Sequence, residues 1–145
     1  ATGTIAITRT ERLAPKAPRL TAASMPHAFP DTVKPLEEPV FFELRQYHVR
    51  PGQQARWVKC MEEEIIPFQT KMGMVVHGSF VGEQDDSVYV WMRRFESEEE
   101  RVRLYEAVYH SEYWKTQIAP RVPEMLDRDK TVVTRIVATP KSVMH

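Results

Sequence analysis

Apolar and polar residues alternate along the segment FFELRQYHV at residues 41–49, and this period of two predicts a β-strand. The strand ends at Pro51-Gly52, a typical turn pair. Apolar residues then recur at steps of three and four, which predicts an amphipathic helix with Val58, Met61, Ile65, Phe68 and Met72 on its buried side. Because Pro67 has no amide hydrogen, we expect this helix to kink or break around Glu63–Pro67.

The second half of the chain repeats these two patterns. The apolar runs MVVHGSFVG and SVYVWMRRF lie on either side of EQDD and predict a β-hairpin. Ser97-Glu98-Glu99-Glu100 has the form of a capping box, so a second helix begins there. The β-branched segment TVVTRIVAT predicts a last strand. The order β-α-β-β-α-β predicts an α+β, ferredoxin-like fold, in which both helices cover one face of a four-stranded antiparallel sheet.

Strand alternation divides the predicted sheet into two faces. We expect the apolar set to meet the helices: Phe42, Leu44, Val76, Phe80, Val88, Val90, Met92, Val132 and Ile136. The other set is aromatic and charged: Glu43, Arg45, Tyr47, His77, Ser79, Tyr89, Trp91, Arg93 and Arg135. These side chains are too bulky to leave in solvent, so we expect the sheet of a second copy to cover them. The predicted assembly is a homodimer or a higher homo-oligomer.

Residues 1–39 hold more than half of the eleven prolines and show neither a strand period nor a helix period. Such a segment runs extended and builds no core by itself, so it is predicted to be an arm in front of a domain at residues 40–145. Its spaced apolar residues would let it clasp a partner subunit, with anchors at Leu13, Leu20, Phe29 and Leu36. A disordered linker or tail fits the same composition.

Charge and cysteine content limit the possible partners and compartments. Twenty Lys and Arg balance twenty Asp and Glu, so no net field directs the chain to nucleic acid or to an anionic membrane. No apolar stretch is long enough to span a bilayer. The single cysteine, Cys60, cannot form an intramolecular disulfide, and a reducing, cytoplasmic setting is expected. The basic, Thr-rich first residues leave an organelle transit peptide as the alternative.

Several short segments occur in one order: ELRQYHVRPG, then VYVWMRRFES leading into EEERVRLYEA, then SEYWKTQIAPRVPEML. In this order residues 41–139 resemble the NIPSNAP family. The resemblance implies a dimeric α/β barrel whose protomers pair sheet to sheet, often with a small pocket between sheet and helices. That superfamily includes haem enzymes, cofactor-free monooxygenases, isomerases and decarboxylases, as well as proteins without established chemistry, so the fold does not decide the function.

The first strand carries the strongest candidate chemistry. Glu43, Arg45 and Tyr47 project from one face of this strand, about 7 Å apart. In a functional interpretation, Arg45 binds a substrate carboxylate or enolate while Glu43 or Tyr47 moves a proton. In a structural interpretation, Glu43 and Arg45 form a buried ion pair that sets the register of the interface.

Other residues extend this candidate site. His77 could be a catalytic base or an axial haem ligand, and His48 could be such a ligand too. A lone strand histidine is usually a hydrogen-bonded polar residue, which is the structural alternative for His77. Tyr89, Trp91 and Arg93 could wall a pocket for a flat substrate, and His110 could line its mouth. Because H-x-H, H-E-x-x-H and C-x-x-C spacings are absent, no metal site is expected, and no cofactor is expected apart from the haem alternative.

Two functions follow from these patterns. One is a small-molecule-binding dimer that acts as a cofactor-independent isomerase, cyclase, decarboxylase or monooxygenase on a small oxygenated apolar substrate. The other is a non-catalytic dimer that binds another protein. An enclosed pocket with converging Arg, Tyr and His would favour the enzyme, whereas an interior filled by Met and Phe would favour the interaction protein.

Overall fold

The structure, a computed structural model, describes residues 38–145. The predicted clasp of the arm therefore lies outside the described residues. The elements in chain order are β1 (Phe41–Val49), α1 (Gln54–Cys60), η1 (Met61–Ile65), α2 (Ile66–Lys71), β2 (Val75–Val81), β3 (Val88–Phe95), α3 (Glu98–Tyr109), η2 (Trp114–Ile118), α4 (Val122–Met125) and β4 (Leu126–Ile136), where η1 and η2 are π-helical turns. None of the helices within this range is long and apolar enough to cross a membrane.

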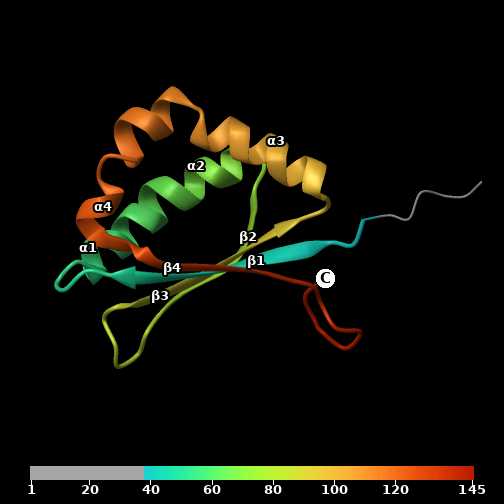
Figure 1. The fold of residues 1–145 in the computed structure, drawn as a ribbon, viewed down its shortest axis with the longest axis horizontal. Helices are drawn as coiled ribbons and strands as arrows, with labels where there is room; N and C mark the ends of the chain where they lie inside the picture. Colours follow the sequence, from blue (N-terminus) through green and yellow to red (C-terminus); the bar gives the residue numbers. More distant parts are fainter. Residues whose placement is uncertain (1–37) are drawn as a thin grey trace, which may run out of the picture. The chain divides into compact units, whose positions relative to one another are not determined.

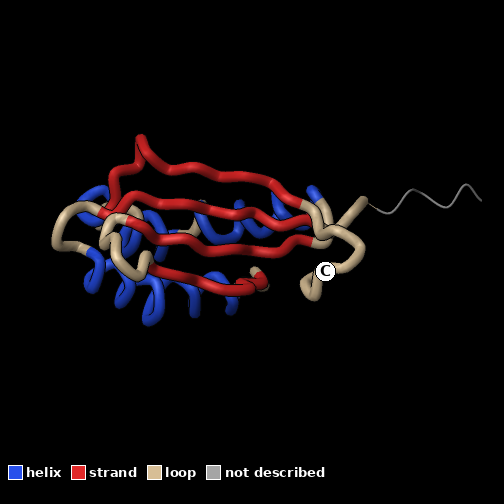
Figure 2. Tube along the Cα trace, turned by 90° about the horizontal axis from the view of Figure 1, so that it is seen from below, coloured by secondary structure: helices blue, strands red, loops and turns tan. Residues whose placement is uncertain are grey.

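The four strands form one antiparallel sheet in the order β2-β3-β1-β4 (Figure 2). The helices all lie on one side of this sheet (Figure 1). This arrangement confirms the predicted ferredoxin-like α+β fold, and the central strands β1 and β3 carry most of the residues buried beneath the helices.

The first helical segment contains a π-helical turn, η1, just before Pro67. The amide of Ile66 bonds to the carbonyl of Met61, five residues back, just before Pro67. The predicted disturbance around Glu63–Pro67 thus takes the form of a wide turn within a continuous helical segment. The extra residue in this turn rotates the helix, so that Gln69 is buried in place of the expected Phe68.

The prediction of which sheet face meets the helices was wrong. The aromatic and charged set lies beneath them: Trp91 is 1% exposed and Arg93 is fully buried. The expected apolar set lies largely on the open face, where Phe80 is 61% exposed and Val132 is 50% exposed. Alternation separates two faces but does not say which one is inside when both sets are bulky. Here the aromatic and charged face is the buried one, because the helices supply hydrogen-bonding partners for its charges.

A β-bulge in β2 explains the position of His77. Val76 pairs with Arg93 and Gly78 pairs with Met92, so His77 is an extra residue between them. Its imidazole packs edge-on against the ring of Phe42, with 5.3 Å between the ring centres, on the open face of the sheet. Uninterrupted alternation had predicted that His77 faces the same side as Arg93, which is wrong.

A second irregularity lengthens the start of β4. Gln46 of β1 pairs with Val132, but His48 pairs with Asp127, so residues 128–131 lie opposite a single residue of β1. The strand therefore begins at Leu126, five residues before the predicted segment TVVTRIVAT. This widened segment brings Arg128 and Thr131 to the space between sheet and helices.

Candidate functional site

A cavity of about 400 Å³ lies between the sheet and the helices. From the sheet, Arg45 and Tyr47 of β1 and Trp91 of β3 line it. Trp57 and Gln69 line it from the first helical segment. Fourteen residues border the cavity, and none of them is acidic or a histidine, so its charged groups are arginines alone.

Both π-helical turns contribute to the walls of this cavity. Met61 and Ile65 of η1 and Trp114 of η2 border it. In η2 the amide of Ala119 donates to the carbonyl of Trp114 at 2.8 Å, which closes the wide turn. Single π-turns inside helices occur frequently at functional sites, and two of them on one cavity support its assignment as the candidate site.

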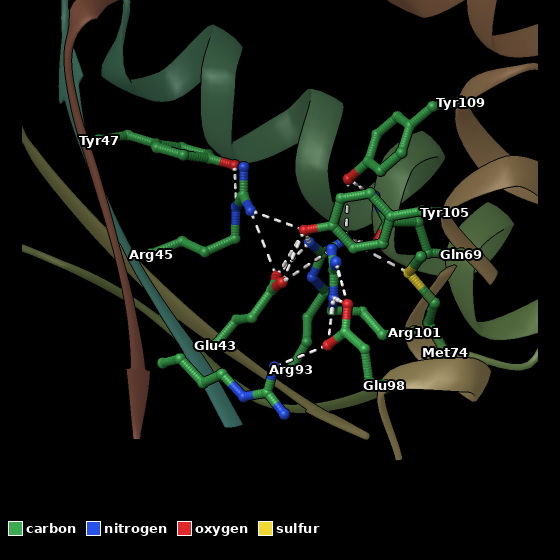
Figure 3. A network of polar contacts seen from close by, with 11 residues as sticks. Glu43, Arg45, Tyr47, Gln69, Met74, Arg93, Glu98, Arg101, Tyr105 and Tyr109 are labelled. Atoms are coloured by element: carbon green, nitrogen blue, oxygen red, sulfur yellow. Dashed lines mark hydrogen bonds and ion pairs between the residues drawn. The ribbon is translucent and has the colours of Figure 1, made fainter. Parts of the chain in front are cut away.

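Arg45 is held at the cavity wall by side chains of the sheet and of α3 (Figure 3). Its Nε donates to the hydroxyl of Tyr47 at 2.8 Å, and its Nη1 donates to the hydroxyl of Tyr105 at 3.1 Å and to Glu43 at 3.3 Å. Its Nη2 has no hydrogen-bond partner among residues 38–145. The guanidinium is therefore fixed by two of its nitrogens, and the third is free for a ligand.

Arg93, which is fully buried and lies opposite Glu43 on the neighbouring strand, is the principal partner of Glu43 (Figure 3). One nitrogen of Arg93 donates to Glu43 at 2.6 Å and to the hydroxyl of Tyr105 at 2.6 Å. The other donates to the hydroxyl of Tyr109 at 2.8 Å and to Gln69 at 3.0 Å. Tyr105 in turn donates to the Glu43 carboxylate.

The ionisation of Glu43 follows from these contacts. Burial works to raise the pKa of its carboxyl, but the Arg93 charge and the hydrogen bonds from Tyr105 and Arg93 outweigh burial and hold the pKa below its usual value. An ionised carboxylate bound in this way is a poor proton acceptor. Glu43 also does not border the cavity, so the structure gives it the geometry of a group that positions the two arginines.

The cluster around Glu43 carries excess positive charge. Arg101 lies 3.8 Å from Glu43 and also pairs with Glu98, which binds Arg135 at 2.6 Å. Four guanidinium groups thus share two carboxylates, and they belong to Arg45, Arg93, Arg101 and Arg135. In the buried part of the cluster, Arg45 and Arg93 share the single carboxylate of Glu43, whereas the side chains of Arg135 and Glu98 are accessible to solvent.

The structure brings some of the predicted site residues together and separates others. Arg45, Tyr47 and Trp91 border the cavity. Tyr89 is buried beside Trp57 but does not border the cavity, and burial raises its pKa to about 12. His110 ends α3 and is exposed.

Neither histidine of the haem alternative borders the cavity. His77 lies on the open face, and His48 pairs with Val88 at the end of β1. Within residues 38–145, no group of three or more His, Cys, Asp or Glu side chains is placed to hold a metal ion. Of the Arg, Tyr and His side chains that were expected to converge on one pocket, only Arg and Tyr border the cavity.

Sequence reasoning missed most of the cavity wall, including Trp57, Gln69, Arg128 and Thr131. Gln69 had no signal, because the extra residue of the π-helical turn η1 is what turns it towards the interior. Arg128 and Thr131 had none either, because only the irregularity in β4 brings them there.

The contacts of Glu43 predict which arginine matters for stability. Arg93→Met leaves a buried carboxylate without its closest partner and should lower the free energy of unfolding by about 3–5 kcal/mol. Arg45→Met should cost less, because Glu43 keeps Arg93 and Tyr105. Urea unfolding gives the free energy of unfolding of both variants. The double variant Glu43→Met/Arg93→Met should recover much of the stability that Arg93→Met loses. A larger cost for Arg45→Met than for Arg93→Met would contradict this assignment.

The lowered pKa of Glu43 predicts a dependence of stability on pH. Because the folded-state pKa lies below the unfolded value near 4.5, the carboxylate stabilises the fold fully above that value and loses its contribution as pH falls through the folded pKa. The stability difference between the wild type and Glu43→Gln should therefore be largest at about pH 6 and shrink towards about pH 3. Denaturant unfolding at both pH values checks this, and an equal difference at the two would refute it.

Comparisons with known proteins place this fold in a family. The NIPSNAP family model matches residues 42–140. A NIPSNAP family protein from Agrobacterium tumefaciens has a TM-score of 0.65 and 22% identity, over 73% of this chain and 99% of the other. A second one from that organism, described as having unknown function, has a TM-score of 0.66 and 19% identity, over 74% and 95%.

A NIPSNAP domain protein from Burkholderia xenovorans has a TM-score of 0.62 and 16% identity, over 70% of this chain and 97% of the other. No curated protein matches the chain. At these identities the solved structures support the fold, and the family model covers most of residues 38–145. The chain belongs to the NIPSNAP family.

Proposed function

We propose that this chain binds a small, partly apolar, oxygen-bearing molecule in the cavity between sheet and helices, with Arg45 holding the ligand's oxygen. The observation that carries the proposal is the Nη2 of Arg45 at the cavity wall, which has no hydrogen-bond partner among residues 38–145. A guanidinium fixed at its other nitrogens is preorganised, so little side-chain entropy is lost when a ligand binds.

The size and walls of the cavity support this proposal. Its volume of about 400 Å³ falls in the range of small-molecule sites. Its lining combines aromatic and polar groups: Trp57, Trp91 and Trp114 supply rings, and Arg45 and Tyr47 supply polar groups from β1. Apolar rings beside a few placed polar groups suit an oxygenated organic molecule that is partly apolar.

A specific contact favours proton-transfer chemistry as a second candidate function. The hydroxyl of Tyr47 accepts from Arg45 Nε at 2.8 Å, so a ligand oxygen at Arg45 would lie close to a phenol that can donate a proton. Cofactor-independent isomerase, cyclase, decarboxylase or monooxygenase activity stays a prediction. Tyr47→Phe would test this prediction, because it should keep ligand binding and lose turnover.

The alternative function is a non-catalytic protein-interaction dimer. It predicts no turnover in the wild type or in Tyr47→Phe.

The open face of the sheet supports the proposal that two copies pair. Its exposed apolar residues lie on neighbouring strands: Val75, Phe80, Val88 and Val132. Leu44, Val90 and Met92 are partly buried between them. A continuous apolar surface of this kind is stable in water when another surface covers it, and a second copy offers the same antiparallel face.

The binding proposal predicts that filling the cavity abolishes binding. Isothermal titration with 2-naphthamide and 2-naphthoate should give one site per protomer in the wild type. Ala119→Phe places a ring into the cavity wall and should remove that site, while Val102→Phe, on the exposed side of α3, should bind as the wild type does. If neither probe binds the wild type at millimolar concentration, or if folded Ala119→Phe still binds normally, the proposal fails.

The pairing proposal predicts that charge on the open face separates the copies. Light scattering at micromolar concentration should give a dimer for the wild type and a monomer for Phe80→Glu, because the new carboxylate would be buried without a partner. Val102→Glu, which changes an apolar position on α3 that is 52% exposed against 61% for Phe80, should remain a dimer. A monomeric wild type, or a dimeric Phe80→Glu, would contradict pairing through this face.

A further inference from the structure

We infer that the cavity selects planar aromatic monoanions, with the ligand's carboxylate at Arg45 and its ring among the aromatic side chains of the walls. This inference rests on the proposed function and names the chemical class of its ligand. Two independent features of the described residues carry it, namely the charge balance behind the cavity and the aromatic groups around Arg45.

The charge balance favours an anion over a neutral molecule. The Glu43 carboxylate lies 2.6 Å from Arg93 and 3.3 Å from Arg45, so it neutralises mainly the charge of Arg93. Burial works to lower the pKa of Arg45, but the phenols of Tyr47, Tyr109 and Tyr105 outweigh it and the pKa is raised, which keeps the guanidinium charged. A largely buried cation without a carboxylate of its own is costly, and a ligand carboxylate would supply the missing partner.

The lining reinforces this preference and excludes the opposite charge. The charged residues on the cavity wall are Arg45 and Arg128, and the wall carries no acidic side chain. An ammonium ligand would meet two guanidinium groups, and a neutral ligand would leave Arg45 with only the carboxylate that it shares with Arg93.

The aromatic groups favour a planar ligand over a bulky aliphatic one. The Arg45 guanidinium lies 5.6 Å from the centre of the Tyr47 ring and 6.0 Å from that of Trp91. On the helix side, Trp114 packs edge-on against Tyr109 with 4.7 Å between ring centres. Rings thus border the cavity from the sheet and from the helices, and a flat ligand can meet ring faces and edges on both sides.

Three probes with one carbon skeleton test this inference in the full chain. 2-Naphthoate carries the ring and the charge, 2-naphthamide lacks the charge, and decahydro-2-naphthoate lacks the planarity. By titration calorimetry, 2-naphthoate should bind about ten to a hundred times more tightly than 2-naphthamide, the range expected for a charge-assisted hydrogen bond. It should also bind more tightly than decahydro-2-naphthoate.

Arginine variants then assign the preference to a residue. In Arg45→Met the preference for 2-naphthoate over 2-naphthamide should disappear, while 2-naphthamide still binds. Arg103→Met, which removes a charge from the exposed surface of α3, is the matched control and should keep the full preference. Loss of the preference in Arg128→Met with retention in Arg45→Met would overturn the assignment to Arg45.

The outcomes separate this inference from the proposed function. If the two naphthalene derivatives bind equally and Ala119→Phe removes both, the cavity binds small molecules but the inferred preference for anions is wrong. If decahydro-2-naphthoate binds as tightly as 2-naphthoate, the inferred planarity is wrong. If no probe binds, the proposed function itself fails.

Discussion

The buried pair of Arg93 and Glu43 is the interaction on which the arrangement of this domain depends. A guanidinium with no exposure must be paired and hydrogen-bonded, because an unpartnered charge in the interior costs several kcal/mol. The partners of Arg93 come from three directions: Glu43 from β1, Gln69 from α2, and the phenols of Tyr105 and Tyr109 from α3. The network therefore ties both long helical segments to the centre of the sheet.

This polar centre divides the interior into two apolar clusters and leaves room between them. Along β1, the helix-facing residues are apolar at the two ends, Phe41 and Val49, and charged in the middle. One cluster surrounds Phe41 and Leu104 and the other surrounds Trp57 and Trp91. The cavity borders the second cluster next to Arg45. There the aromatic rings and the residues of the two π-helical turns leave a space beside the charged groups.

The sequence contained enough to predict the element order and the ferredoxin-like fold, since turn pairs, periods and the Ser97 cap are local signals. It could not predict which sheet face is inside, because the partners of Arg93 come from residues far apart in the chain. One of these partners is the hydroxyl of Tyr105, which accepts a hydrogen bond from Arg93. The position of His77 depends on a bulge that alternation does not reveal, and Arg128 reaches the cavity through an irregular β4.

Glu43 and Arg45 do form a largely buried ion pair, but its position bears on the predicted role in an interface. As a pair that sets the register of a sheet-to-sheet interface, they would have to face the open side of the sheet. Both instead face the helices, where Tyr105 of α3 bonds to each of them. The side chains of β1 that face the open side are the intervening Leu44 and Gln46. Charge and cavity thus belong to one face of the sheet and the exposed apolar surface to the other, so ligand binding and pairing would use separate sets of side chains on the same strands.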